Sequence, residues 1–130
     1  DYYCDWSSDV CSSDLAVDGH TPVLDTPEAI TAAGLAGDPV AMEVLNQFSI
    51  WLGRVAGNNV LTTGARGGVY IVGGVIPRFA DFFIHSDFAK SFSDKGCMSD
   101  YFKGIPVWLV TAPYSGLTGA GVALEQAFAL

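Results

Sequence analysis

The stretch GGVYIVGGVIPRF, residues 67–79, decides the fold class of this chain. Its centre, Val69 to Val72, is a continuous run of β-branched and aromatic residues between two glycine pairs. Such a run is typical of a strand that is buried on both faces of a parallel sheet. A second run of the same kind, PVWLV, occupies residues 106–110. Helical patterns precede, separate and follow the two runs, so the sequence predicts an α/β fold with a parallel pair of strands and flanking helices.

Two helix-start patterns precede the first strand. In residues 26–28 (TPE), threonine can cap the free amides, proline suits the first helical position and the acid faces the positive end of the helix dipole. This pattern predicts a short helix that runs to about Leu35. Residues 38–39 (DP) repeat it, and apolar residues at steps of three and four then predict a long amphipathic helix to about Thr62.

Shorter elements are expected in the rest of the chain. Residues 76–83 and 86–93 have helical character, and Ser86 is the expected cap of the second piece. Residues 94–104 predict a surface loop with one further helical turn. The segment SGLTGAGVALEQAFAL, residues 115–130, predicts a glycine-rich turn that leads into a terminal helix.

The first fifteen residues differ from the rest. They contain four acids and no base, and they show neither a helical nor a strand period. A codon sequence for Asp5 to Asp14 is similar to a common short-read sequencing adapter. We therefore expect residues 1–15 to be a non-native, adapter-derived tail, and residues 16–130 to be the partial lobe of a truncated protein.

Charge and apolar content limit the classes of partner. The net charge of −8 falls to −4 without the tail. The chain therefore lacks the excess of positive charge that is typical of proteins that bind nucleic acid or an anionic membrane. The sequence contains no run of eighteen apolar residues, so it predicts no membrane-spanning helix. Without the two cysteines of the tail, Cys97 stands alone, which fits a reducing cytoplasm and argues against a disulfide framework.

Two glycine-rich segments are candidate ligand sites. Gly73 and Gly74 directly follow the first strand, and a ligand over the carboxyl end of a parallel strand is the usual arrangement in open α/β sheets. Gly116, Gly119 and Gly121 lie at the expected start of the last helix, where free backbone amides can bind phosphate. Tight helix packing is the alternative reading of both segments. Neither segment has the spacing of a dinucleotide fingerprint or of a phosphate-binding P-loop.

Other candidate residues carry less specific chemistry. Arg78 is either an ion-pair residue at a helix end or interface or a nucleotide contact, and we favour the structural role. Arg66 receives no phosphate-binding role. His20 and His85 have no partner at ligand spacing, so no metal site is predicted. Cys97 lacks the pattern of a histidine-paired nucleophile.

Residues 64–83 (GARGGVYIVGGVIPRFADFF) and 92–124 (FSDKGCMSDYFKGIPVWLVTAPYSGLTGAGVAL) resemble the carboxyl-terminal part of bacterial glucokinases. These are hexose kinases of the actin–hexokinase superfamily, and the resemblance covers about residues 26–130. It implies an incomplete, ribonuclease H-like large lobe. By resemblance, Gly73 and Gly74 form the adenosine-motif pair. The glycines of the last helix, Gly116, Gly119 and Gly121, resemble the connecting motif at the hinge between the lobes.

The resemblance also implies a function for the parent protein: glycolytic phosphorylation of the 6-hydroxyl of glucose, with ATP and Mg²⁺, by a cytoplasmic enzyme that is commonly a homodimer. The family's catalytic base and sugar-binding residues precede the matching region, so we assign no catalytic residue. We expect this chain to carry only the adenosine-side half-site and to be inactive alone. A stand-alone nucleotide-binding or regulatory module and a purely structural lobe are the alternatives.

Overall fold

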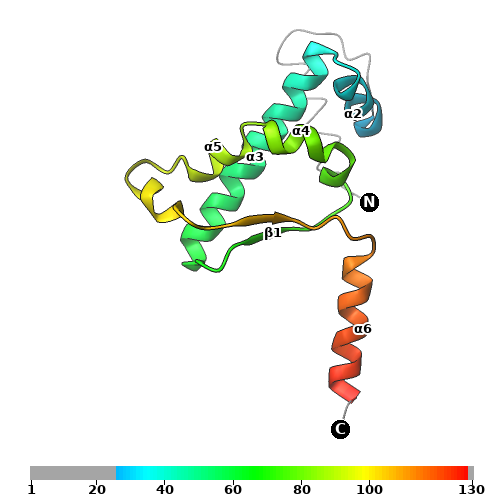
Figure 1. Cartoon of the computed structure of the whole chain (residues 1–130), viewed down its shortest axis with the longest axis vertical. Coiled ribbons are helices and arrows are strands. Elements are labelled where there is room, and N and C mark those ends of the chain that lie inside the picture. Colours follow the sequence, from blue (N-terminus) through cyan, green and yellow to red (C-terminus); the bar gives the residue numbers. More distant parts are fainter. Residues whose placement is uncertain (1–25, 129–130) are drawn as a thin grey trace, which may run out of the picture.

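A computed structural model describes residues 26–128, which form helices on one side of a two-stranded sheet and one helix that projects away from it (Figure 1). The elements in chain order are α2 (Pro27–Leu35), α3 (Pro39–Thr63), β1 (Val69–Ile71), the 3₁₀ helix η1 (Ile76–Phe79), α4 (Ala80–His85), α5 (Phe88–Ser93), the 3₁₀ helix η2 (Gly96–Phe102), β2 (Val107–Leu109) and α6 (Ser115–Phe128). The predicted α/β class is therefore confirmed.

Helices α2 and α3 begin at the capping residues that the sequence indicates. The Thr26 hydroxyl accepts a hydrogen bond from the amide of Ala29 at 3.2 Å, and the Asp38 carboxylate accepts one from Ala41 at 2.8 Å. Each bond satisfies an amide that has no partner within the helix. The long helix α3 ends at Gly64, whose φ of 65° places it in the left-handed conformation common at helix ends.

The segment between the strands is more broken than expected. The predicted helix over 76–83 is a 3₁₀ turn, η1, that continues as α4 to His85. Helix α5 begins at Phe88, and its N-cap residue is Asp87 rather than the predicted Ser86. The Ser86 hydroxyl still accepts a hydrogen bond from the Phe88 amide at 3.3 Å. The expected loop turn is η2, a 3₁₀ helix.

The two strands are parallel, as predicted, with Val69 opposite Val107 and Ile71 opposite Leu109. The Val69 amide donates to the Pro106 carbonyl, and the Val110 amide donates to the Ile71 carbonyl, both at 2.9 Å. The strands thus run in the same direction, and their carboxyl ends lie side by side.

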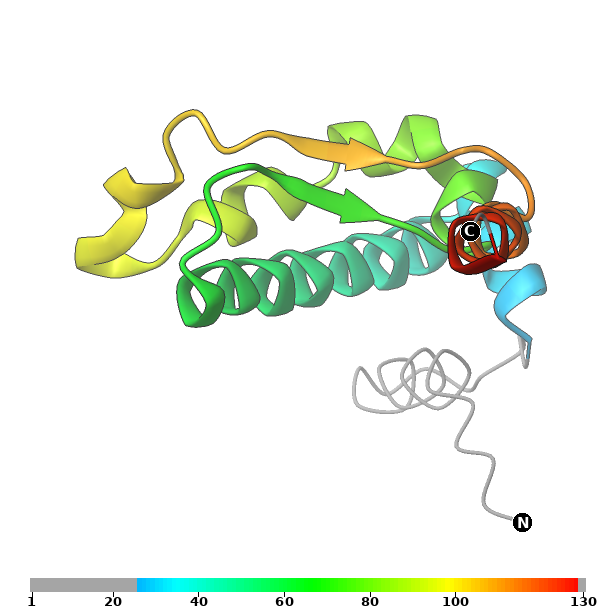
Figure 2. The same ribbon diagram turned by 90° about the horizontal axis from the view of Figure 1, so that it is seen from below.

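The core lies between the helices and one face of these strands. Figure 2 shows β1 and β2 side by side, with α3 running along the β1 side. The side chains of Val69 and Ile71 pack against it from β1. The buried members of this core are Leu45, Val60, Ile76, Phe79, Phe83, Phe88, Phe92 and Phe102. Ile30, Ala41 and Val44 form a smaller cluster between α2 and α3. Burial of these side chains is the main stabilising contribution to the fold.

Close packing of α3 against α5 depends on two glycines one helical turn apart. A Cβ atom at Gly53 would lie 2.6 Å from the Phe88 carbonyl oxygen, and one at Gly57 would lie well inside van der Waals contact with that of Phe92. The absence of side chains therefore allows the backbone of α5 to approach α3 directly.

One expectation for the strands is wrong. Both runs were expected to be buried on both faces, but only the face toward the core is covered by the described residues. On the other face Tyr70 is 66% exposed and Trp108 is 41% exposed, and their rings stack with centroids 4.6 Å apart. The physical reason is that nothing within residues 26–128 lies over this face.

Helix α6 contrasts with the rest of the molecule because none of its described residues is buried. It leaves the carboxyl end of β2 and projects away from the sheet (Figure 1). None of the helices within the described part of the chain is both long and apolar enough to cross a membrane.

Candidate functional site

The candidate site lies at the edge of the sheet where β1 and β2 both end. Because the strands are parallel and in register, the chain leaves both of them at the same edge. After β1 it passes through Gly73 and Gly74 to η1, and after β2 it passes through Tyr114 to α6. Ligands of open α/β sheets usually bind at this edge.

Gly73 and Gly74 lie where the sequence places them, directly beyond β1. Gly73 has φ of 154°, a backbone conformation that side chains rarely adopt. A Cβ atom built at either glycine meets no atom within 4 Å among the described residues. The space beside this glycine pair is therefore open, and tight packing within residues 26–128 does not explain the pair.

The second glycine group requires a correction. The sequence predicts a glycine-rich turn before the last helix, but Gly116, Gly119 and Gly121 all lie inside α6. The turn is made instead by residues up to Tyr114, which has a left-handed φ of 58°. The error arose because glycine lowers helix propensity, which the structure overrides here.

The same correction separates the three glycines in space. Gly116 lies in the first turn of α6, beside the strand ends, whereas Gly119 and Gly121 lie farther along the helix, which rises by about 1.5 Å per residue. None of the three has an atom of the described chain within 4 Å of a Cβ position. Helix packing within residues 26–128 therefore does not explain them either.

Arg66 and Arg78, the two arginines considered from the sequence, both have partners among the described residues. The Arg78 guanidinium forms an ion pair with the Glu28 carboxylate at 2.7 Å, which links η1 to α2. The structural role favoured for Arg78 is thus the one that the geometry supports. Arg66 lies over the ring of Tyr101, with its guanidinium carbon 4.6 Å from the ring centroid.

No metal centre forms in the described part of the chain: residues 26–128 contain no group of three or more histidine, cysteine or acidic side chains placed to hold an ion. The Nδ1 atom of His85 lies 2.7 Å from the Asp81 carbonyl oxygen on the same helix. Cys97 is a free, exposed thiol on η2. His20 lies outside the described residues.

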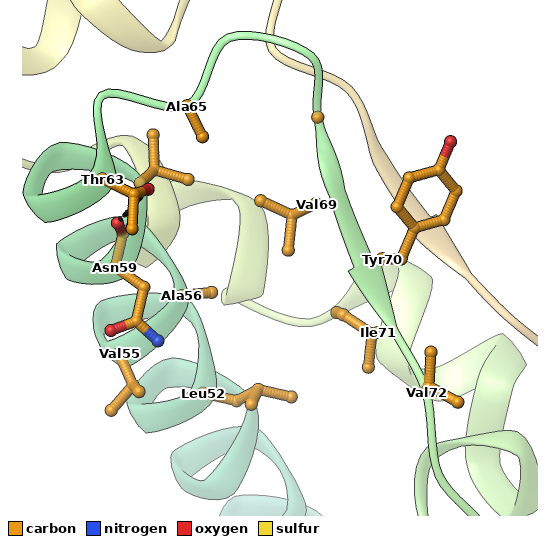
Figure 3. Close-up of a pocket in the computed structure, with 12 residues that line it drawn as sticks. Leu52, Val55, Ala56, Asn59, Thr63, Ala65, Val69, Tyr70, Ile71 and Val72 are labelled. Carbon is orange, nitrogen blue, oxygen red and sulfur yellow. Dashed lines mark hydrogen bonds between the residues drawn. The ribbon is translucent and has the colours of Figure 1, made fainter. Parts of the chain in front are cut away.

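Sequence reasoning missed a cavity of about 470 Å³ between α3 and the free edge of β1 (Figure 3). Leu52, Val55 and Ala56 line it from the helix, and Val69 and Ile71 point into it from the strand. A second cavity, of about 520 Å³, lies at the opposite edge of the sheet among β2, α4, α5 and η2. The apolar run of β1 indicated burial, but it could not indicate where a cavity would lie beside the strand.

Comparison with known proteins shows to which family a chain with this arrangement belongs. A sequence model of the glucokinase family matches residues 9–127. The chain belongs to the glucokinase family. Glucokinase of Pseudomonas aeruginosa (strain LESB58) is 50% identical over 113 residues, which cover 86% of this chain and 34% of that protein. Glucokinase of Hahella chejuensis is 51% identical over 111 residues, covering 85% and 34% of the two chains.

A solved glucokinase structure agrees with the fold. The crystal structure of glucokinase from an Antarctic psychrotroph superposes with a TM-score of 0.79 at 37% identity, covering 92% of this chain and 37% of that one. The α/β arrangement is thus part of a larger actin/hexokinase-like fold. The chain spans about a third of the length of the curated glucokinases that it matches. The family match begins at residue 9, inside the segment 1–15, whose origin stays a prediction.

Proposed function

We propose that the longer protein represented by this chain phosphorylates the 6-hydroxyl of glucose, with ATP as phosphoryl donor and Mg²⁺ as its metal. The observation that carries this proposal is the match to the glucokinase family over residues 9–127, together with about 50% identity to bacterial glucokinases. Phosphoryl transfer depends mainly on positioning and on electrostatic stabilisation of the phosphates, so different parts of a fold can supply different components.

Within that reaction, we assign the adenosine side to the carboxyl edge of the strands. The open space beside Gly73 and Gly74 fits a nucleoside, because no side chain lies between the ligand and the backbone. The first turn of α6, which contains Gly116, presents free amides at the same edge. Gly119 stays a candidate only through the family resemblance, since it lies a helical turn farther on.

We assign neither a catalytic base nor a Mg²⁺ ligand to the described residues. Mg²⁺ in such sites is held by one or two carboxylates and by the substrate phosphates, and residues 26–128 contain no acidic cluster of metal-binding geometry. The residues that accept the proton of the glucose hydroxyl and bind the sugar are expected in the part of the family's chain that this sequence does not match. A cytoplasmic location and a homodimeric state are further predictions.

An ATP titration by calorimetry tests the assignment of the adenosine side. Gly74→Val would project a side chain into the proposed nucleoside space, so we expect ATP affinity to fall by about tenfold or more, which corresponds to about 1.4 kcal/mol. Gly67→Val is the matched control, because Gly67 flanks the opposite end of β1 and also has no atom within 4 Å of a Cβ position. Its affinity should equal that of the unmodified chain.

Two results would change the proposal. A flat titration of the unmodified chain would leave this region with a structural role alone. Binding of ATP without phosphoryl transfer to glucose, in a chain extended to the full length of the family, would favour a non-catalytic nucleotide-binding module.

A further inference from the structure

Arg78 makes two bonds that join the end of the glycine segment to a distant helix. Its amide donates to the Val75 carbonyl at 3.1 Å, and its Nη1 atom donates to Oε1 of Glu28 in α2 at 2.7 Å. Val75 directly follows Gly73 and Gly74. One residue therefore links the proposed nucleoside segment to a helix that lies 50 residues away in the sequence.

The glycine segment is fixed mainly through its two ends. A Cβ atom at Gly73 or Gly74 meets no atom within 4 Å among the described residues, and Val75 is 43% exposed. Glycine has more conformational freedom to lose than any other residue, so such a segment is not ordered by its own side chains. At one end the Ile71 carbonyl accepts a hydrogen bond from the Val110 amide, and at the other end η1 begins.

The 3₁₀ helix η1 is held on two different faces. Residues three apart share one face of a 3₁₀ helix, and Ile76 and Phe79 are both buried in the core, with exposed fractions of 5% and 2%. Arg78 lies between them in sequence, and its side chain leaves η1 in another direction, toward α2. The core contacts fix where η1 lies, and the ion pair restricts how it can tilt.

Helix α2 is a firm support for the other half of the ion pair. Ile30 is 1% exposed and packs with Ala41 and Val44, which fixes α2 against α3. Glu28 lies in the first turn of α2, where the helix dipole favours a carboxylate. An ion pair this exposed adds little to the stability of the whole molecule. Its effect is therefore expected locally, at η1 and the segment that η1 ends.

We propose that Arg78 is a positioning residue for the nucleoside: through its ion pair with Glu28 it holds the backbone from Gly73 to Val75 in the open arrangement seen here. Arg78 acts through this backbone and not by contact with ATP. A segment that is ordered before binding costs less to order on binding, which raises affinity. The proposal rests on the proposed function, because it matters for the reaction only if the nucleoside lies beside these glycines.

Backbone ¹⁵N relaxation of the 130-residue chain tests the proposal without any ligand. We expect amide order parameters of about 0.85 at Gly74 and Val75 in the unmodified chain, and about 0.6 or less in Arg78→Met. Methionine keeps an unbranched apolar stem and removes only the charged head. Arg78→Lys, which keeps the charge, should restore most of the order. Lys103→Met is the matched control, because it breaks the 2.7 Å ion pair with Asp100 on η2 and should leave both amides unchanged.

A double variant shows whether Arg78 and Glu28 act as a pair. Glu28→Ala removes the carboxylate and should loosen Gly74 and Val75 as Arg78→Met does. The double variant should loosen them no further, because residues that share one interaction have non-additive effects. Calorimetric titration with ATP then measures the consequence for binding. Arg78→Met should lower ATP affinity by about two- to fivefold, in keeping with the loss of one exposed ion pair.

Three outcomes would overturn the proposal. The order parameters of Gly74 and Val75 could be unchanged in Arg78→Met, the effects of the two single variants could add in the double variant, or the segment could loosen while ATP affinity stays the same. The last result would leave Arg78 with a structural role alone. A segment that loosens in a chain whose unmodified form gives a flat ATP titration would support the hold of Arg78 on the segment and contradict the nucleoside site in the proposed function.

Discussion

Helices α3 and α6 are both rich in apolar and small residues, yet they lie in opposite surroundings. Helix α3 buries seven residues along its length, whereas none of the described residues of α6 is buried. Within α6, Leu117 is 73% exposed and Phe128 is 80% exposed. Residues 115–128 carry one charged side chain, Glu125. A helix that is apolar over most of its surface is normally a buried helix.

The glycines of the two helices differ in the same way. Gly53 and Gly57 of α3 are in contact with the backbone of α5, while Gly119 of α6 faces open space. The comparison shows that a pattern of apolar or small residues on a helix indicates a surface against which the helix packs. For α3 that surface lies within residues 26–128. For α6 the described residues do not contain it.

A matched pair of phenylalanine substitutions should give the largest contrast. Phe92 is 5% exposed, and its ring packs edge-on against Phe102 at 5.0 Å, so Phe92→Ala should lower the free energy of unfolding by about 3–5 kcal/mol. Phe128→Ala should change it by less than about 0.5 kcal/mol, because the ring has no buried contact to lose.

Urea denaturation followed by circular dichroism measures both values. A large loss for Phe128→Ala would mean that α6 is packed in solution, and the contrast between the helices would then disappear.

Glycine substitutions should give opposite signs in the two helices. Gly57→Ala places a methyl group against the carbonyl of Phe92, and such overpacking should cost about 1–3 kcal/mol. Gly119→Ala meets no neighbour and replaces glycine by the best helix former, which should increase the helicity of α6 and leave stability unchanged or higher by up to about 1 kcal/mol.

Denaturation midpoints and the helical signal at low denaturant report the two effects separately. Equal effects at both positions would show that the open space around α6 is filled in solution.

Local chemistry explains why much of the fold could be predicted from the sequence. The caps Thr26 and Asp38 each bond to an amide three residues along, so the starts of α2 and α3 can be read from neighbouring residues. The strand at residues 69–71 and its parallel partner follow from short apolar runs bounded by glycine and proline.

What could not be predicted depends on contacts between distant residues. The glycines of α6 were placed in a turn because propensity disfavours them in a helix, and nothing local indicates otherwise. The composition of a strand indicates burial but does not name the covering element, so the strand runs alone did not indicate what would lie over Tyr70 and Trp108. For the candidate site, the position of Gly73 and Gly74 beyond β1 was readable from sequence. The cavity beside α3 was not.

The smallest expected contrast concerns single hydrogen bonds near the starts of the two helices. The Asp38 carboxylate caps α3 through the Ala41 amide at 2.8 Å, so Asp38→Ala should cost about 1 kcal/mol, while Asp38→Asn should retain most of the capping effect. In α6 the Thr118 hydroxyl donates to the Tyr114 carbonyl at 3.3 Å on an exposed surface, and Thr118→Ala should change stability by less than about 0.5 kcal/mol. The four chains are compared by urea denaturation under one set of conditions. If Asp38→Asn lost as much stability as Asp38→Ala, the carboxylate charge rather than the cap bond would be what stabilises the start of α3. The cap hydrogen bond would then not be among the interactions that stabilise α3.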